Sequence, residues 1–333
     1  MTPPRLVAIT GASGFLGRAL LERLVPRQRV RALFRRHDDV SAAWARRGCE
    51  IVVGNLDDAD ALAYLVRGAD VVQHCAATMG KSNARLSHRV NVVGTERLVR
   101  AAVDAGVPRF VYVSSISVFA ATRRSDGTIT EAVEPERVDR LNPYGRTKYQ
   151  GEVRTRTLTA GTGTRYTILR PTNIYGPGSG PWFHAFERLL RRVPVAIGDL
   201  PIDVVYVEDV VDAMILAAGS PAAADGVFHL SHEMVNMNRF ILKVAEVTGQ
   251  RAWRLPRAVD RVLRGTIDRG YRTVTRTHMS MSLVHPAFYP HGHAHATFDY
   301  APRVRLAEGF ARLAAWYRPA APAPTPRPAL RPT

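Results

Sequence analysis

The stretch "ITGASGFLGRAL", residues 9–20, carries three glycines spaced three apart, Gly11, Gly14 and Gly17. It follows a short apolar run and precedes a run with helical periodicity. At such a junction Gly11 makes the tight turn, Gly14 lets a pyrophosphate approach the helix N-terminus, and Gly17 lets the helix pack on the strand. A glycine triplet alone also fits an ordinary strand-to-helix turn, so its interpretation depends on the rest of the chain.

Short β-branched runs alternate with longer helical patterns in the N-terminal part of the chain. The predicted strands are residues 6–10, 30–34, 50–53, 70–74 and 110–114, with helices between them, for example over 86–105. Strands that alternate with helices imply right-handed crossovers and a parallel sheet covered on both faces. The pattern therefore predicts an α/β fold with a doubly wound parallel sheet, the Rossmann arrangement.

The second half of the chain is less regular. We predict a helix over 144–158 and strands at 166–170, 204–207 and 226–230. Residues 1–170 would form mainly the dinucleotide-binding core and residues 171–317 mainly a smaller substrate lobe, with the strand and helix near 203–218 returning to the core. The tail, residues 318–333, is rich in proline and poor in large apolar side chains, and we expect it to be disordered.

The 333-residue chain has a net charge of +17, and 43 of its 46 basic residues are arginines. These are scattered instead of forming a stripe with aromatic residues, which argues against a nucleic-acid partner. Cys49 and Cys75 lie in apolar runs and are interpreted as buried side chains. No apolar run reaches the roughly 18 residues that cross a bilayer, and no signal-peptide pattern is present, so we expect a cytoplasmic protein.

Tyr144 and Lys148 stand four residues apart on a predicted helix, and therefore on one face of it. An ammonium near a tyrosine stabilises the phenolate and lowers its pKa, which suits a group that exchanges a proton with a hydroxyl or carbonyl. The hydride would move to or from a nicotinamide. The serines of "VSSISVF", residues 113–119, follow a strand that should end beside such a cofactor.

The second predicted strand ends in Arg35 and Arg36, at the place where an acidic residue normally holds the ribose hydroxyls of NAD. Arginine there accommodates a 2′-phosphate. NADP(H) is therefore the favoured cofactor, with NAD(H) still possible.

Nine motifs, in order along the chain, carry a family resemblance. They are "TGASGFLG" (10–17), "GNLDD" (54–58), "VVQHCAA" (71–77), "VNVVGT" (90–95), "FVYVSSISVF" (110–119), "PYGRTK" (143–148), "LRPTNIYGPG" (169–178), "VYVEDVVDA" (205–213) and "YAPRVRLAEGFARLAAWY" (300–317). Over about residues 5–317 the chain resembles the extended short-chain dehydrogenase/reductase family, also known as the NAD-dependent epimerase/dehydratase family. Members often pair into dimers, so the resemblance also makes a homodimer possible.

The resemblance implies roles for individual residues. The catalytic set would be Tyr144 as acid/base, Lys148 as its electrostatic partner, Ser115 as the oxygen-binding hydroxyl and Asn91 as a supporting residue. Ser114 and Ser117 lie near enough to take the place of Ser115, and Asn91 could instead simply hold two elements together. The implied cofactor contacts, besides the three glycines, the two arginines and the Tyr–Lys pair, are Ser13, Phe15, Leu16, Asn55, Leu56, Ala76, Ala77, Pro171 and Asn173. The family usually has aspartate at position 55, but the amide oxygen of Asn55 can still accept from an adenine amino group.

The substrate is less clear from the sequence. Sugar-nucleotide members grip a diphosphate with an arginine where this chain has Ile202, and the segment 77–91 is short. Both features favour the branch that resembles 3β-hydroxysteroid dehydrogenases and dihydroflavonol reductases. Candidate pocket residues are Met79, Ser117, Trp182, Phe183 and Phe186, although apolar side chains of this kind also fit a core.

Two further segments carry weaker signals. Residues 255–274 are basic and partly amphipathic, which fits a solvated helix better than one that rests on a membrane or covers a pocket. Histidines alternate in the loop 285–296, at 291, 293 and 295, without the geometry of a closed metal site, so we expect no metal.

Taken together, these observations predict an NAD(P)-dependent oxidoreductase that interconverts a ketone and a secondary alcohol on a steroid-, flavonoid- or polyketide-like small molecule. A sugar-nucleotide epimerase, dehydratase or 4-ketoreductase is the first alternative. A non-catalytic NADP-sensing binding protein is an alternative of another class.

Overall fold

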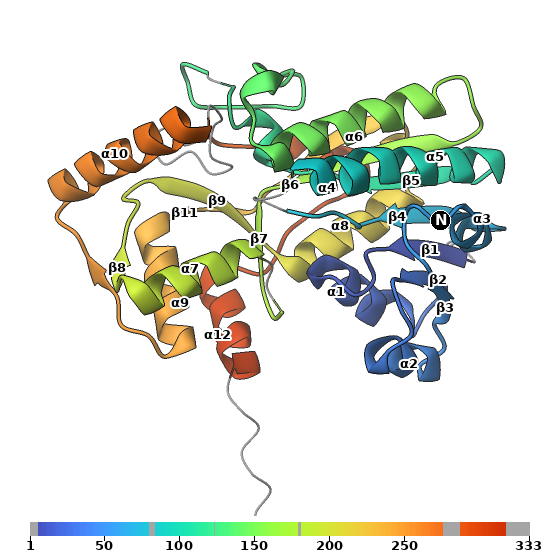
Figure 1. Cartoon of the computed structure of the whole chain (residues 1–333), viewed down its shortest axis with the longest axis horizontal. Coiled ribbons are helices and arrows are strands. Elements are labelled where there is room, and N and C mark those ends of the chain that lie inside the picture. Colours follow the sequence, from blue (N-terminus) through green and yellow to red (C-terminus); the bar gives the residue numbers. More distant parts are fainter. Residues whose placement is uncertain (1–5, 80–83, 123, 179–180, 276–286, 318–333) are drawn as a thin grey trace, which may run out of the picture.

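The computed structural model describes residues 6–79, 84–122, 124–178, 181–275 and 287–317. Within these ranges seven strands form one parallel sheet in the order β10-β6-β5-β4-β1-β2-β3 (Figure 1). The strands are β1 (Leu6–Thr10), β2 (Arg29–Phe34), β3 (Glu50–Val53), β4 (Val71–His74), β5 (Arg109–Val113), β6 (Arg165–Pro171) and β10 (Gly226–Leu230). The order reverses between β1 and β4, which confirms the doubly wound parallel sheet predicted from the sequence.

Helices cover both faces of this sheet, and this explains why its central strands are continuous apolar runs. β1, with the sequence LVAIT, is buried at every residue. One face packs on α1 (Phe15–Leu24), α2 (Asp39–Arg46) and α8 (Val207–Gly219). The other packs on α3 (Ala59–Val66), α5 (Thr95–Asp104) and α6 (Pro143–Thr159).

The helix predicted over 86–105 is not a regular α-helix throughout. It consists of α4 (Ala84–His88), a π-helical stretch (Arg89–Gly94) and then α5. The π-helical stretch contains Asn91, and such wide turns are common where a helix adjusts a side chain at a functional site.

The second lobe is built on a three-stranded sheet in the order β11-β9-β7. Its elements are β7 (Asn173–Tyr175), α7 (Pro181–Arg192), β8 (Val195–Ala196), β9 (Pro201–Tyr206), β11 (Glu233–Asn236), α9 (Met237–Thr248), β12 (Trp253–Arg254), α10 (Arg257–Thr275) and α12 (Leu306–Tyr317). The remaining helix, α11 (Gly292–Phe298), packs on β10 of the large sheet. The core of the lobe is aromatic, with Tyr175 in contact with the rings of Tyr206, Phe240 and Phe310. Among the described residues, none of these helices combines the length and apolar character that a bilayer span requires.

Two expectations differ from the structure. We expected the strand near 203 to return to the core sheet, but β9 pairs with β7 and β11, and β10 pairs with β6 instead. Alternate side chains explain this, because Val204 and Tyr206 lie in the core of the lobe while Val205 lies in the core of the large sheet. The expected return of the following helix does occur, since α8 packs on β5 and β6.

The histidine-rich loop also differs, because α11 begins within it at Gly292. Each histidine there has its own neighbour: His291 contacts the Ser231 hydroxyl, His293 the Phe228 ring and His295 the Tyr300 carbonyl. The predicted disordered tail, 318–333, lies outside the described residues.

Candidate active site

A cavity of about 830 Å³ runs along the carboxyl ends of the parallel strands. Its lining comes from the segments that follow β1, β2, β3, β4 and β5 and from the end of β6 onward. Ligands of open α/β sheets bind at this edge. The predicted cofactor residues that line it are Gly11, Ser13, Gly14, Phe15, Leu16, Gly17, Arg35, Asn55, Leu56, Ala76, Ala77, Tyr144, Lys148, Pro171 and Asn173.

Arg36 is the exception among the predicted cofactor residues. It does not line the cavity, its side chain is 82% exposed, and it pairs with Asp38 at 3.1 Å. The structure therefore separates the two arginines that the sequence could not distinguish, with Arg35 on the cavity and Arg36 outside it.

The glycine loop has the shape of a phosphate cradle. Gly11 adopts a φ of +73°, and a Cβ there would fall 2.6 Å from the backbone nitrogen of Ala76. A Cβ on Gly17 would collide with the carbonyl of Gly11, so this glycine lets α1 approach β1. Gly14 is the N-cap of α1 and supplies no side-chain cap, which leaves the first N–H groups of the helix available to an anion. These features fit a dinucleotide diphosphate.

Helix α6 places the Tyr–Lys pair at the cavity. Its start is fixed by Asn142, whose side-chain oxygen accepts from the Gly145 N–H at 2.9 Å, and by Pro143 in its first turn. The Ser115 side chain lies close enough to the Tyr144 hydroxyl to lower its pKa, and the Ser115 hydroxyl donates to the Ser117 hydroxyl at 3.0 Å. The Lys148 ammonium lies 4.3 Å from the centre of the Tyr112 ring and is almost fully buried. Serine, tyrosine and lysine thus meet at one wall of the cavity.

Burial governs the protonation of this pair. It raises the pKa of Tyr144 to about 12, and the Ser115 side chain opposes the rise. Burial also lowers the pKa of Lys148 to about 8, although the Glu152 carboxylate opposes that fall. The sequence predicted a tyrosine with a lowered pKa; in the structure desolvation is the larger effect, so Tyr144 is a phenol that can donate a proton.

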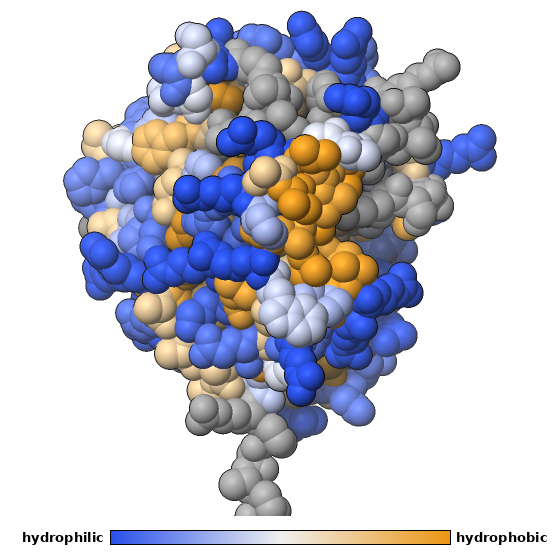
Figure 2. Space-filling view, turned by 90° about the vertical axis from the view of Figure 1, so that its left-hand side faces the viewer, coloured by the Kyte–Doolittle hydropathy of each residue, from blue (hydrophilic) through white to orange (hydrophobic). Residues whose placement is uncertain are grey.

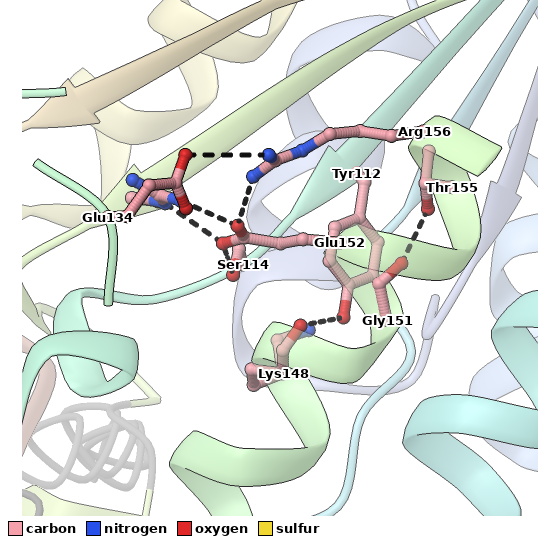
Figure 3. A network of polar contacts seen from close by, with 9 residues as sticks. Tyr112, Ser114, Glu134, Lys148, Gly151, Glu152, Thr155 and Arg156 are labelled. Atoms are coloured by element: carbon pink, nitrogen blue, oxygen red, sulfur yellow. Dashed lines mark hydrogen bonds and ion pairs between the residues drawn. The ribbon is translucent and has the colours of Figure 1, made fainter. Parts of the chain in front are cut away.

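A buried ionic network lies beneath the pair (Figure 3). Glu152, one helical turn after Lys148, is completely buried and forms a two-pronged ion pair with Arg170, at 2.9 and 2.6 Å. Its carboxylate also accepts from the Ser114 hydroxyl at 2.5 Å and from Arg156 at 3.0 Å. Because the Ser114 hydroxyl points to Glu152, Ser115 is the serine that faces Tyr144.

Asn91 does not line the cavity. It is 1% exposed, and its side chain bonds both backbone groups of Thr78, at 2.8 and 2.9 Å. Its amide also donates to the Thr147 hydroxyl at 3.0 Å. Asn91 therefore clamps the segment after β4 onto α6 beside Lys148, which matches the positioning role that the sequence left open.

The predicted substrate residues divide into two groups. Met79 and Ser117 line the cavity. Phe183 is instead fully buried in the core of the lobe, and Phe186 packs on Phe240. This corrects their assignment as pocket residues, because α7 turns Phe186 toward Phe240 of α9 and Phe183 toward Tyr317 of α12. The side chain of Trp182 lies outside the described residues.

Several lining residues were missed by the sequence analysis. Arg89 and Asp57 lie at the same end of the cavity as Asn55 and pair at 2.6 Å. Thr172 and Ile174 line the opposite end, beside Asn173. Thr172 and Ile174 belong to the motif at 169–178, from which they could have been predicted as lining residues. The pairing of Arg89 with Asp57 depends on the π-helical turn at 89–94, which has no clear sequence signal.

Comparison with known proteins gives these features a context. The family model described as the NAD dependent epimerase/dehydratase family matches residues 7–231. A 2-alkyl-3-oxoalkanoate reductase from Stenotrophomonas maltophilia is 30% identical, covering 93% of this chain and 98% of the relative. A UDP-glucose 4-epimerase from Vibrio cholerae is 27% identical, covering 76% of this chain and 79% of the relative.

Solved structures agree with the fold. The structure of MoeE5 in complex with UDP-glucuronic acid and NAD superposes with a TM-score of 0.73 at 26% identity, covering 93% of this chain and 98% of that one. The similar proteins thus include both a reductase of an oxoalkanoate and enzymes that carry sugar nucleotides.

Proposed function

This chain belongs to the NAD-dependent epimerase/dehydratase family, as an enzyme of the extended short-chain dehydrogenase/reductase type, and we propose that it interconverts a ketone and a secondary alcohol on a largely apolar small molecule. Steroid-, flavonoid- and polyketide-like skeletons are the substrate class we have in mind. NADP(H) is the cofactor we favour.

The distribution of arginines in the cavity carries this proposal. Among the described lining residues the arginines are Arg35 and Arg89, and both lie at the end formed by the segments after β2 and β3. The opposite end, where a substrate would meet Tyr144, is lined by Met79 and Ile174. A sugar nucleotide would place a diphosphate there, and a diphosphate calls for arginine.

Ile202 supports the same conclusion. The family resemblance implies that it stands where sugar-nucleotide members hold an arginine, and its side chain is buried in the core of the lobe. It pairs with Val235 across the β9–β11 ladder. A phosphate group would find an apolar, closed surface at this position.

The residues at the wall of the cavity supply the proton chemistry. A bound nicotinamide would donate or accept the hydride. The Ser115 hydroxyl donates a hydrogen bond to the carbonyl oxygen of the substrate, and Tyr144 delivers its proton to that oxygen as the alcohol forms. The charged form of Lys148 stabilises the phenolate left behind. In the reverse direction Tyr144 accepts the proton from the alcohol.

The choice of NADP(H) rests on Arg35. It lines the cavity directly after β2, where it can pair with a 2′-phosphate. Asp57, the acidic residue in the lining, is already held by Arg89 and Arg97 and does not take the place of the usual ribose-binding acid.

The test is a panel of apolar ketones and sugar nucleotides, each followed through the absorbance of the reduced cofactor. A ketoreductase consumes one reduced cofactor for each alcohol formed, whereas an epimerase returns the hydride and consumes none. We expect stoichiometric consumption with an apolar ketone, and a loss of about 10²-fold or more in kcat for Tyr144→Phe.

Tyr149→Phe is the matched control, since this tyrosine lies on the same helix outside the cavity lining, and it should keep its activity. Turnover of sugar nucleotides without net consumption would replace the proposal by the epimerase alternative. Tight cofactor binding without turnover of any member of the panel would favour the sensing protein.

A further inference from the structure

Helix α10 is attached to the lobe through a buried carboxylate. Asp260 is completely buried, and its carboxylate accepts from the backbone N–H groups of Gly198 and Asp199 at 2.7 and 2.9 Å. Arg264, one turn later, pairs with the same carboxylate at 2.7 Å. These polar contacts attach the helix to the loop before β9.

The valines of the same helix point to the outside. Val259 is 51% exposed and Val262 is 70% exposed. A surface helix normally buries its apolar side chains and exposes its charges. The outward side of α10 instead carries Val259 and Val262 together with the exposed Arg261, so apolar and cationic side chains share one surface.

Neighbouring elements extend this apolar surface. β12 pairs with β8 in a register that sets Trp253 beside Val195, and Trp253 is 58% exposed. Val193, just before β8, is also exposed. We call Val193, Trp253, Val259 and Val262 the α10 face. Figure 2 views the molecule from the side that carries α10 and β8, and it shows a hydrophobic patch with hydrophilic side chains beside it.

The charged side chains around the α10 face are mostly arginines. Exposed arginines are Arg254 on β12, Arg257, Arg261 and Arg269 on α10, Arg192 at the end of α7 and Arg251 just before β12. The carboxylates within the group are already engaged, Asp260 by Arg264 and Asp199 by Arg257. Exposed valines and an exposed tryptophan set among arginines complement a surface that is anionic outside and apolar just beneath.

We propose that the α10 face docks this enzyme on an anionic lipid surface, with Trp253, Val259 and Val262 inserted at the level of the headgroups. A second copy of the chain fits less well, because a twofold contact would bring the arginines of both copies together. The inference does not depend on the substrate, so it can fail while the proposed function holds, and the reverse.

The test is flotation of the full chain with vesicles of pure phosphatidylcholine and with vesicles of equal parts phosphatidylcholine and phosphatidylglycerol. We expect binding to the anionic vesicles that weakens as salt is added. The double variants Val259→Asp/Val262→Asp and Arg254→Glu/Arg261→Glu should each lose about tenfold or more in partitioning.

Matched controls lie on α2, which is far from α10 in Figure 1. Val40 and Arg46 are exposed there, and Val40→Asp and Arg46→Glu should bind vesicles like the unaltered chain. Three results would overturn the proposal: no preference for anionic vesicles, equal binding by the α10 variants, or a change from dimer to monomer in the valine variant. If anionic vesicles are not preferred, an acidic protein becomes the expected partner. If the valine variant changes from dimer to monomer, the α10 face is the contact between two copies of the chain.

Discussion

Lys148 is held in a place that disfavours its own charge, because burial lowers the pKa of its ammonium from 10.5 to about 8. Above pH 8 the folded chain releases this proton while the unfolded chain keeps it until about 10.5. The unfolded state then binds more protons, so the stability contributed by this residue rises with pH across that window. Below that window, the charged and buried Lys148 at the cavity wall therefore lowers the free energy of unfolding.

Replacing Lys148 tests whether its buried charge lowers the stability of the folded chain. Lys148→Met should abolish activity and yet stabilise the chain at about pH 7 by on the order of 3 kcal/mol. At about pH 10 the gain should largely vanish. Urea unfolding at the two pH values, without added cofactor, measures both. Lys243→Met is the control, since that lysine is exposed and paired with Glu246; parallel stability curves for Lys148→Met and the unaltered chain would contradict the account.

The proposed preference for NADP(H) rests on a single residue, Arg35. We expect Arg35→Ser to weaken NADPH binding by about 10- to 100-fold, since a charged pair with phosphate is lost, and to leave NADH binding nearly unchanged. Arg36→Ser is the matched control because its side chain is exposed and faces Asp38. Titration of each variant with both cofactors by calorimetry gives the four affinities. Equal losses in the two variants would show that the cavity position of Arg35 has no special role.

At the scale of elements, glycine substitutions at the β1–α1 junction test whether this loop is a phosphate-binding cradle or an ordinary turn. A Cβ on Gly17 collides with the Gly11 carbonyl, whereas one on Gly14 meets that carbonyl at 3.1 Å and otherwise faces the cavity. We expect Gly17→Ala to cost about 1–3 kcal/mol of stability and to lose cofactor binding. Gly14→Ala should keep most of the stability of the chain and still weaken the binding of the cofactor.

Gly163→Ala provides the baseline for both variants, since a Cβ at Gly163 meets no atom within 4 Å. Thermal unfolding with and without NADPH reports stability and binding together. If Gly14→Ala binds the cofactor as tightly as Gly163→Ala does, the loop is a turn and the ligand lies elsewhere.

The elements that could be predicted from the sequence are those with a local signal. β3 and β10 match their predicted ranges, 50–53 and 226–230, because short β-branched runs between turn residues need no distant partner to be recognised. β9 was expected to return to the core, and it pairs with β7 and β11 while its Val204 and Val205 face two different cores. A pattern of alternation cannot say which core each face meets.

The residues of the candidate site also divide into those with a local sequence signal and those that depend on contacts between distant elements. Tyr144 and Lys148 follow from a four-residue spacing on one helix. The pairing of Glu152 with Arg170 depends on how α6 packs on β6, and so does the commitment of Ser114 to Glu152. The net pKa of Tyr144 was misjudged because the depth of burial cannot be read from spacing.

At the scale of the whole molecule, the large sheet carries the cofactor segments and the small lobe closes the cavity at Asn173 and Ile174. The α10 face lies on the lobe, and none of its four residues lines this cavity. An enzyme that takes apolar substrates gains from a nearby lipid surface, yet the two properties rest on separate residues. Loss of vesicle binding in the α10 variants should therefore leave turnover of a dissolved substrate unchanged.

The central claim is that a hydride passes between a nicotinamide and an apolar carbonyl carbon in this cavity. NADPH deuterated at the transferable position, offered with a ketone that is turned over, tests it most directly when the product alcohol is weighed by mass spectrometry. The account predicts one deuterium on the carbinol carbon, with labelled alcohol formed about 10²-fold more slowly, or not at all, by Tyr144→Phe. An alcohol without deuterium, or labelled alcohol formed as fast by the Tyr144→Phe variant, would contradict it.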